Sequence, residues 1–312
     1  MKPAFNIGRR FVIAVPYLWL AVFFVVPFLI LLRISLTDMG PGVDPFAPIV
    51  EQADCAWRLV LKVQNYLSIF QAEAQGSAAH GSTIYVDAYV TSLKYAFLTT
   101  LLCLVMGYPF AYFLARARPS VRPLLLLLGV MLPFWTSFLL RVYAWKGILA
   151  DQGVLNNALL ALGVVDEPVA MLYTDVSMLV GMTYVYCPFM ILPLYANLVK
   201  MDVQLLEAAH DLGASGWHTF WCVTVPLSRS GIVAGCLLVF IPALGEFVIP
   251  SLLGGAENLM IGRVVWDEMF TSNNWPRAAA LAVVMMVAIL VPLAFYYRSV
   301  SAPGSRFAGN AR

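Results

Sequence analysis

Long apolar runs separated by polar segments dominate the chain. Each run is long enough to cross the hydrocarbon core of a bilayer, which takes about 20 helical residues. The pattern therefore predicts an all-α integral membrane protein with six transmembrane helices. The predicted spans are residues 11–32, 92–114, 124–141, 176–198, 231–253 and 278–297.

The first apolar run begins a single predicted membrane domain that covers residues 1–312. A basic lead of Lys2, Arg9 and Arg10 precedes this run, as in a secretory signal. The run is longer than a signal core of about 7–15 residues and has no small-residue cleavage site, so it is expected to be a retained span. Two polar segments interrupt the domain, a loop or cap at 33–91 and a loop at 199–230.

The distribution of charge predicts the orientation. With the N-terminus inside, the inner segments carry eleven Lys and Arg residues against three acids, whereas the outer segments carry eight against thirteen. Inner loops of membrane proteins are enriched in Lys and Arg. Both termini and the 199–230 loop are therefore expected in the cytoplasm, and the 33–91 segment in the periplasm.

Composition agrees with a membrane protein and excludes several kinds of site. Hydrophobic residues make up 61% of the 312 residues and charged residues 12%, whereas a soluble domain carries about 25% charged residues. The five cysteines form no CxxC or Cys/His pattern, so no metal site is expected. The chain also lacks a G-x-x-x-x-G-K-[ST] phosphate loop and an H-E-x-x-H motif, and it is expected to be non-catalytic.

The 199–230 loop contains a helix-forming segment that begins at Glu207 and reaches Gly213. Gly213 follows the first helical run where a left-handed cap is expected. A second run, from Trp217 to Val223, should end near Pro226, because proline obstructs a continuing helix. The pattern predicts two short helices across the membrane face; an ordinary connecting loop is the alternative.

The order Glu-Ala-Ala, three residues, Gly, then hydrophobic residues and Pro-Leu resembles the cytoplasmic "EAA" loop of permeases in binding-protein-dependent ABC importers. The resemblance implies the type I importer (MetI-like) permease fold and a coupling helix seated in a cleft of a separate ATPase subunit. The residues that it assigns to ATPase coupling are Glu207, Ala208, Ala209, Asp211, Gly213, Ala214, Phe220 and Pro226.

Glu246 is the only acid inside a predicted span. It should lie roughly 22 Å from the inner edge, counted from Gly231 at about 1.5 Å per residue. An ionisable residue at such a depth normally faces a cavity or a partner, and Pro242 and Gly245 should break the helix nearby. Glu246 is thus a candidate substrate contact; the alternative is a structural carboxylate satisfied by Arg141 or by neighbouring amides.

Aromatic residues accompany this acid at similar depth. A carboxylate together with aromatic faces suits an organic cation, through charge pairing and cation–π contact. Two of these aromatics also fit the alternative of an ordinary interfacial belt, namely Tyr143 and Trp145. The complete set of substrate-pathway candidates is Glu246, Trp135, Tyr143, Trp145, Tyr184 and Tyr186.

Several longer segments resemble the permeases of spermidine/putrescine importers, particularly the putrescine type with Gly-Glu-Phe in its fifth span. They are LPFWTSFLLRVYAW, YCPFMILPLY from Tyr186, GCLLVFIPALGEFVIPSLLGG, GVLNN at 153–157 and MIGR at 260–263. The resemblance implies polyamine import across a bacterial inner membrane. The implied partners are a periplasmic polyamine-binding protein, a second permease subunit, an ATPase dimer and membrane lipid, with no nucleic acid.

The same resemblance implies that this chain holds no cofactor and that ATP and Mg are bound by the partner ATPase. One alternative is an ABC importer permease for another small cationic or amine substrate. A more distant one is a proton-coupled secondary transporter with Glu246 as its proton site. That reading leaves the Glu207–Gly213 segment unexplained, and no inverted repeat is evident.

Overall fold

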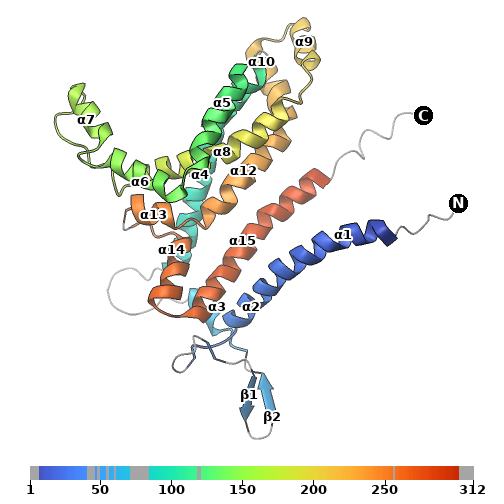
Figure 1. The fold of residues 1–312 in the computed structure, drawn as a ribbon, viewed down its shortest axis with the longest axis vertical. Helices are drawn as coiled ribbons and strands as arrows, with labels where there is room; N and C mark the ends of the chain where they lie inside the picture. Colours follow the sequence, from blue (N-terminus) through green and yellow to red (C-terminus); the bar gives the residue numbers. More distant parts are fainter. Residues whose placement is uncertain are drawn as a thin grey trace, which may run out of the picture. The chain divides into compact units, whose positions relative to one another are not determined.

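The computed structural model describes residues 7–40, 46–47, 50–53, 56–59, 61–70, 84–117, 121–255 and 257–301 (Figure 1). By its internal contacts the chain divides into two compact units. The first comprises residues 1–84 and 264–288, and the second comprises residues 85–263 and 289–312. The second unit contains the candidate sites.

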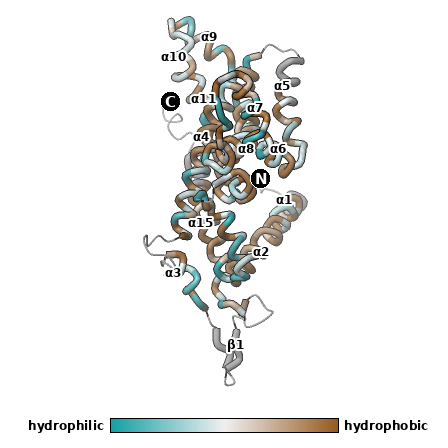
Figure 2. Tube along the Cα trace, turned by 90° about the vertical axis from the view of Figure 1, so that its left-hand side faces the viewer, coloured by the Kyte–Doolittle hydropathy of each residue, from teal (hydrophilic) through white to brown (hydrophobic). Residues whose placement is uncertain are grey.

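The first unit begins with one long apolar helical stretch. It consists of α1 (Ile7–Leu20), a π-helical turn η1 (Ala21–Val25) and α2 (Val26–Ser35). Residues 12–35 are long and apolar enough to cross a membrane, and no residue of their most apolar 18-residue window is buried within the chain. Figure 2 shows this stretch as predominantly hydrophobic. Its apolar side chains therefore suit contact with lipid or with another protein surface.

Polar contacts fasten the end of α2 to the segment that follows. Helix α3 (Gln64–Phe70) is tied to it by Ser35, whose Oγ lies 2.7 Å from the hydroxyl oxygen of Tyr66. The side-chain amide of Asn65 donates to the carbonyls of Ser35 and Thr37, at 2.9 and 2.8 Å. These bonds satisfy carbonyl groups that the end of a helix leaves free.

A short antiparallel hairpin, β1 (Val50–Ala53) and β2 (Ala56–Leu59), lies in the same unit, with Val50 opposite Leu59. This hairpin contradicts the all-α prediction. Two short paired strands contain no long apolar run, so the search for such runs did not detect them. The remaining elements in the described residues are helical. The predicted 33–91 cap thus contains this hairpin and α3, and residues 71–83 lie outside the described residues.

Three helices form the core of the second unit, α4 (Ile84–Arg116), α8 (Asp175–Leu198) and α12 (Arg229–Leu244). Met190 of α8 is fully buried. A Cβ added at Gly107 of α4 would lie 3.2 Å from the Met190 Cγ, and one at Gly235 of α12 only 2.7 Å from its Sδ. Glycine thus lets these helices approach closely, as is usual between membrane helices.

The third predicted span, 124–141, is not one straight helix. Helix α5 (Val121–Met131) ends in a single 3₁₀ turn, η2 (Leu132–Trp135), and α6 (Phe138–Leu149) then departs at 99° before α7 (Val154–Ala161). Pro133 occupies the start of the turn, and Thr136 is extended. Proline supplies no backbone N–H for a bond to the preceding turn, which fits the change from α-helix to a 3₁₀ turn at this point.

The fifth predicted span, 231–253, is also interrupted. Helix α12 ends at Leu244, and α13 (Val248–Leu253) begins after a break of three residues. This confirms the predicted weakness around Pro242 and Gly245. On its other side, α12 meets the helical stretch 216–227 at a bend of 66°.

The remaining helical elements lie before α12 and after α13. They are α9 (Gln204–Asp211), α10 (Gly216–Thr219), the π turn η3 (Phe220–Thr224), α11 (Val225–Leu227), α14 (Ile261–Trp266), the π turn η4 (Asp267–Thr271) and α15 (Trp275–Ser301). Among the described residues, three helices are long and apolar enough to span a membrane. The number rises to five if each bent pair counts as one span.

Candidate functional site

Residues 199–230 connect α8 to the first turn of α12 and fold as a helical hairpin built from α9 and α10 with η3 and α11. Figure 1 shows α9 and α10 at one end of the bundle formed by α4, α5, α8 and α12. The hairpin is held by Leu206 of α9, which is buried, and by Ser215, whose Oγ accepts a bond of 3.3 Å from the His218 N–H. The two short helices predicted from the sequence are present.

Gly213 makes the turn between the two helices. Its φ is +85°, in the left-handed region. The Gly213 N–H donates to the His210 carbonyl at 2.8 Å, and the Ala214 N–H donates to the Ala209 carbonyl at 3.0 Å. These two hydrogen bonds together form a Schellman motif, which ends a helix through a residue in the left-handed conformation. The predicted left-handed cap at Gly213 is confirmed.

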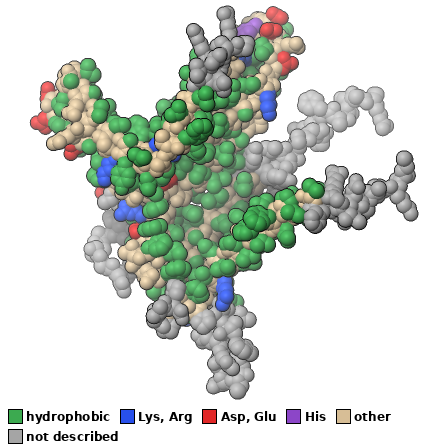
Figure 3. All heavy atoms as spheres, in the orientation of Figure 1, with side chains coloured by type: hydrophobic (Ala, Val, Ile, Leu, Met, Phe, Trp, Pro, Cys, Tyr) green, Lys and Arg blue, Asp and Glu red, His purple; other side chains and the backbone are tan. Residues whose placement is uncertain are grey.

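The outer face of the hairpin is exposed and largely apolar. Leu212 is 90% exposed, Trp217 73% and Trp221 53%. Glu207, Ala208, Asp211 and Gly213 are exposed beside them, whereas Ala209, Ala214 and Pro226 are half-buried. In Figure 3, acidic and histidine side chains gather at the tip formed by α9. Large exposed aromatic side chains rimmed by charges are typical of a protein interaction surface.

Phe220 lies between the outer face and the bundle, and its ring also contacts those of Trp217 and Trp221, with centroids 6.1 and 5.3 Å apart. It is half-buried, and its ring makes edge contacts with the rings of Tyr108 and Tyr112 of α4, each with centroids 5.6 Å apart. The π turn η3 that contains Phe220 is followed by Pro226 in α11, so the helical stretch continues through this proline to Leu227. Phe220 therefore joins the exposed aromatic residues of the hairpin to the bundle.

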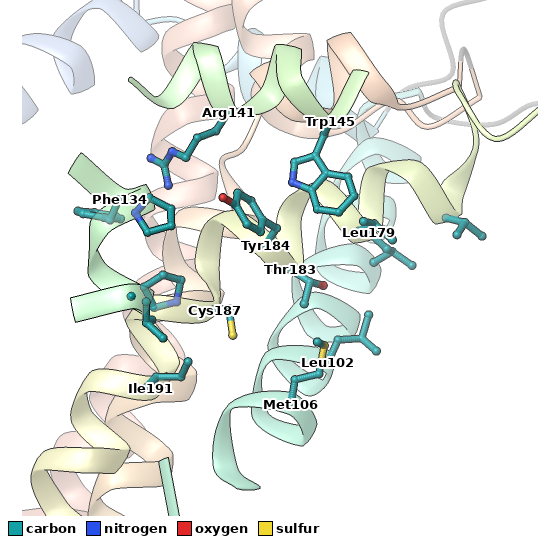
Figure 4. Close-up of a pocket in the computed structure, with 16 residues that line it drawn as sticks. Leu102, Met106, Phe134, Arg141, Trp145, Leu179, Thr183, Tyr184, Cys187 and Ile191 are labelled. Atoms are coloured by element: carbon teal, nitrogen blue, oxygen red, sulfur yellow. The ribbon is translucent and has the colours of Figure 1, made fainter. Parts of the chain in front are cut away.

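A cavity of about 570 Å³ lies within the second unit, between α4, α5, η2, α6 and α8 (Figure 4). Its walls are mostly apolar. The residues that line it are Leu102, Met106, Gly129, Val130, Pro133, Phe134, Arg141, Trp145, Val176, Leu179, Val180, Thr183, Tyr184, Cys187, Pro188 and Ile191.

Two pathway candidates meet at one end of this cavity. The rings of Trp145 and Tyr184 make an edge contact with centroids 5.4 Å apart, and Figure 4 shows them beside Arg141. The Arg141 guanidinium lies over the Phe134 ring, 5.3 Å from its centroid, and its Nε has no hydrogen-bond partner among the described residues. The cavity thus combines aromatic faces with one positive charge.

Glu246 does not line the cavity. It is 8% exposed, and the hydroxyl of Tyr186, itself buried, donates a hydrogen bond to its Oε2. Its Oε1 accepts the backbone N–H groups of Val248 and Ile249, at 3.0 and 3.3 Å. The carboxylate therefore caps the first turn of α13, and both of its oxygens have partners. Of the two structural partners considered for it, backbone amides are present and Arg141 is not.

The other two pathway candidates lie outside the cavity lining. Trp135 on η2 is 85% exposed, and Tyr143 on α6 is exposed as well. Arg141, by contrast, belongs to the lining and was not among the candidates. Its place in the run LPFWTSFLLRVYAW was a usable signal, because an arginine within an apolar run normally faces a cavity or a partner.

Comparison with known proteins gives a consistent answer. Residues 4–302 match the family described as binding-protein-dependent transport system inner membrane component. The spermidine/putrescine transport system permease protein PotB of Haemophilus influenzae is 37% identical over 300 residues, 96% of either chain. PotB of Escherichia coli is 44% identical over 216 residues, covering 69% of this chain and 78% of that protein.

The fold is also found among solved structures. A bacterial ABC transporter involved in the import of the acidic polysaccharide alginate contains a chain that superposes with a TM-score of 0.67. The identity is 17%, and the match covers 96% of this chain and 98% of that one. At this identity the likeness concerns the fold alone.

Proposed function

The chain belongs to the family of binding-protein-dependent transport system inner membrane components, and on that premise we propose that it is the permease subunit of an ATP-driven importer of spermidine and putrescine. The observation that carries the substrate class is the match to the PotB relatives over most of the chain. The exposed hairpin 199–230 supports the ATP-driven mechanism, because it offers a docking surface at one end of the bundle.

The proposed topology has six spans with both termini in the cytoplasm. Three spans are the long apolar helices, and each of the two bent pairs supplies one more, through α5 with η2 and through α12. The sixth is α15, whose apolar stretch Trp275–Val291 continues to Ser301. The inner segments of this arrangement carry the excess of Lys and Arg, as expected for cytoplasmic loops.

The proposed assembly contains four kinds of subunit. A periplasmic polyamine-binding protein delivers the substrate, this chain and a second permease form the pathway, and an ATPase dimer binds ATP and Mg. This chain is then a non-catalytic, multi-pass subunit of the bacterial inner membrane. The surplus of acids in its outer segments would favour the approach of a dication.

The proposed ATPase contact is the outer face of the hairpin. Glu207, Ala208, Asp211 and Gly213 are exposed there, next to Leu212 and Trp217. The small alanine side chain would let a partner surface approach the α9 backbone closely. Movement of this face would favour either an inward-facing or an outward-facing bundle, a two-state element biased by partners at both ends.

The proposed substrate pathway uses the candidates in different ways. Trp145 and Tyr184 offer ring faces in the cavity, where a desolvated ammonium group gains cation–π attraction. Trp135 and Tyr143 present exposed aromatic surface toward the rest of the assembly. Glu246 contributes negative charge from the break before α13, with Tyr186 as its hydrogen-bond donor.

The test is uptake of labelled putrescine, with unlabelled spermidine as competitor, in a host that lacks its own polyamine uptake. The host carries this chain together with its neighbouring transport genes. Uptake that needs ATP and is suppressed by spermidine supports the proposal. An intact complex that imports neither polyamine would overturn the substrate class and leave the family membership unaffected.

A further inference from the structure

Four side chains join the 199–230 hairpin to α4, and we call them the α4 anchor: Tyr108, Tyr112, Phe220 and Ser228. The Phe220 ring meets both tyrosine rings nearly at right angles, at 88° and 87°. Such edge-to-face pairs contribute attraction beyond the burial of their surface. Tyr108 and Tyr112 lie one turn apart on α4, so that Phe220 contacts two successive turns of this helix.

A buried hydrogen bond accompanies the ring contacts. The hydroxyl oxygens of Tyr108 and Ser228 are 2.8 Å apart, and both residues are buried. The Ser228 hydroxyl donates to the Val225 carbonyl at 3.1 Å, so the Tyr108 hydroxyl is the donor to Ser228. Ser228 is the residue between the helical stretch 216–227 and α12, at the 66° bend. The bond therefore holds α4 at the joint about which the hairpin would turn.

The anchored part of α4 is itself locked to the bundle and borders the cavity. Gly107, next to Tyr108, packs against Met190 and Ile191 of α8. Ile191 lines the cavity, and so does Met106 of α4. The anchor thus lies at one end of a continuous packed path that runs from the hairpin to two walls of the cavity.

Chain connectivity alone would not connect the hairpin to these walls. The hairpin is joined covalently to α8 and α12 but not to α4, which precedes it by more than 80 residues. Without a side-chain attachment, the hairpin could turn about its bend at Ser228 while α4 stayed in place. A packed, hydrogen-bonded attachment moves together with the helices that it joins. Packed protein interiors switch between discrete arrangements and do not deform continuously.

We propose that the α4 anchor transmits displacement of the 199–230 hairpin to α4 and so to the cavity, which makes Tyr108 and Ser228 positioning residues for coupled transport. The proposal rests on the proposed function, since it requires that an ATPase displaces the hairpin. It predicts a specific failure when the anchor is loosened. ATP is still hydrolysed, but fewer substrate molecules are imported for each ATP.

The test compares Tyr108→Phe, Ser228→Ala and the double variant in the full complex in proteoliposomes. Tyr112→Phe is the matched control, because it removes the same atom one turn away and retains the ring that contacts Phe220. The readouts are complex assembly, basal ATPase rate and ATP consumed per labelled putrescine imported. Each single variant should raise this ratio by about fivefold, the factor by which a typical hydrogen bond shifts an equilibrium.

The double variant should raise the ratio no further than either single variant, since both remove the same bond. Tyr112→Phe should match wild type. An unchanged ratio in Tyr108→Phe and Ser228→Ala would overturn the anchor. So would a parallel loss of assembly and of both rates, which is the signature of a merely structural role. The proposed function fails separately, when the wild-type complex itself shows no ATP-dependent uptake.

Discussion

The Tyr186 hydroxyl donates a hydrogen bond to Oε2 of Glu246, and so joins the middle of α8 to the break between α12 and α13. The other carboxylate oxygen caps the first turn of α13. One acid thus combines a structural task with the proposed task of supplying negative charge near the pathway.

Substitutions at Glu246 separate these two tasks. In Glu246→Gln the amide oxygen can still accept the N–H groups of Val248 and Ile249, so the protein level should stay near wild type. Putrescine import should fall at least about tenfold, the factor that about 1.4 kcal/mol of lost attraction produces. Putrescine import, measured at equal amounts of wild-type and variant protein in the membrane, tests this prediction.

Glu246→Ala is the companion variant. It leaves the part-buried N–H of Val248 and the buried N–H of Ile249 without an acceptor. A buried group left unpaired costs about 1–3 kcal/mol, so protein level and import should fall together. If Glu246→Gln imported putrescine at the wild-type rate, the role of Glu246 would be limited to capping α13.

Gly213→Ala should uncouple ATP hydrolysis from import, because a Cβ at φ +85° costs about 1–2 kcal/mol and disturbs the turn. Gly216→Ala is the matched control on the same hairpin. A Cβ at either position meets nothing within 4 Å, and of the two only Gly213 has a positive φ. Complex level, ATPase rate and uptake are measured for both. Equal, normal coupling in the two variants would contradict a role for this turn.

Arg141→Gln should lower the KM for putrescine several-fold. The guanidinium lies in the cavity wall, where it repels a dication at short range. Lys146→Gln serves as control, because Lys146 is on the same helix but lies over the Tyr173 ring and outside the cavity lining. Initial uptake rates over a range of putrescine concentrations give KM for each. A KM unchanged in Arg141→Gln, or lowered as much in Lys146→Gln, would argue against passage of the dication by Arg141.

Trp145→Leu should raise the KM for putrescine by about twofold to thirtyfold, since cation–π attraction is worth about 0.5–2 kcal/mol. Trp145→Phe should recover most of the affinity, because it restores a ring face next to Tyr184. The KM of each variant is measured from putrescine uptake at equal protein level. If the two variants had the same KM, the Trp145 ring face would have no part in recognition.

Much of the fold could be predicted from local sequence. A helix that crosses lipid satisfies its own backbone hydrogen bonds and needs apolar side chains, so each span corresponds to an apolar run in the sequence. The left-handed turn at Gly213 could be predicted for a similar reason, because a glycine after a short helical run is a local signal. The break near Pro242 and Gly245 belongs to the same class, whereas the 99° bend around Pro133 was missed.

The sequence by itself determined the apolar helices, the exposed hairpin and its turn, all of which depend on neighbours within a few residues. The tertiary structure alone decided the partners of individual side chains. Glu246 pairs with a tyrosine 60 residues away, and Tyr108 with a serine 120 residues away. Such pairs depend on how each helix is rotated and where it crosses its neighbours. Those quantities are set by packing of the whole bundle and leave no periodic pattern in the chain.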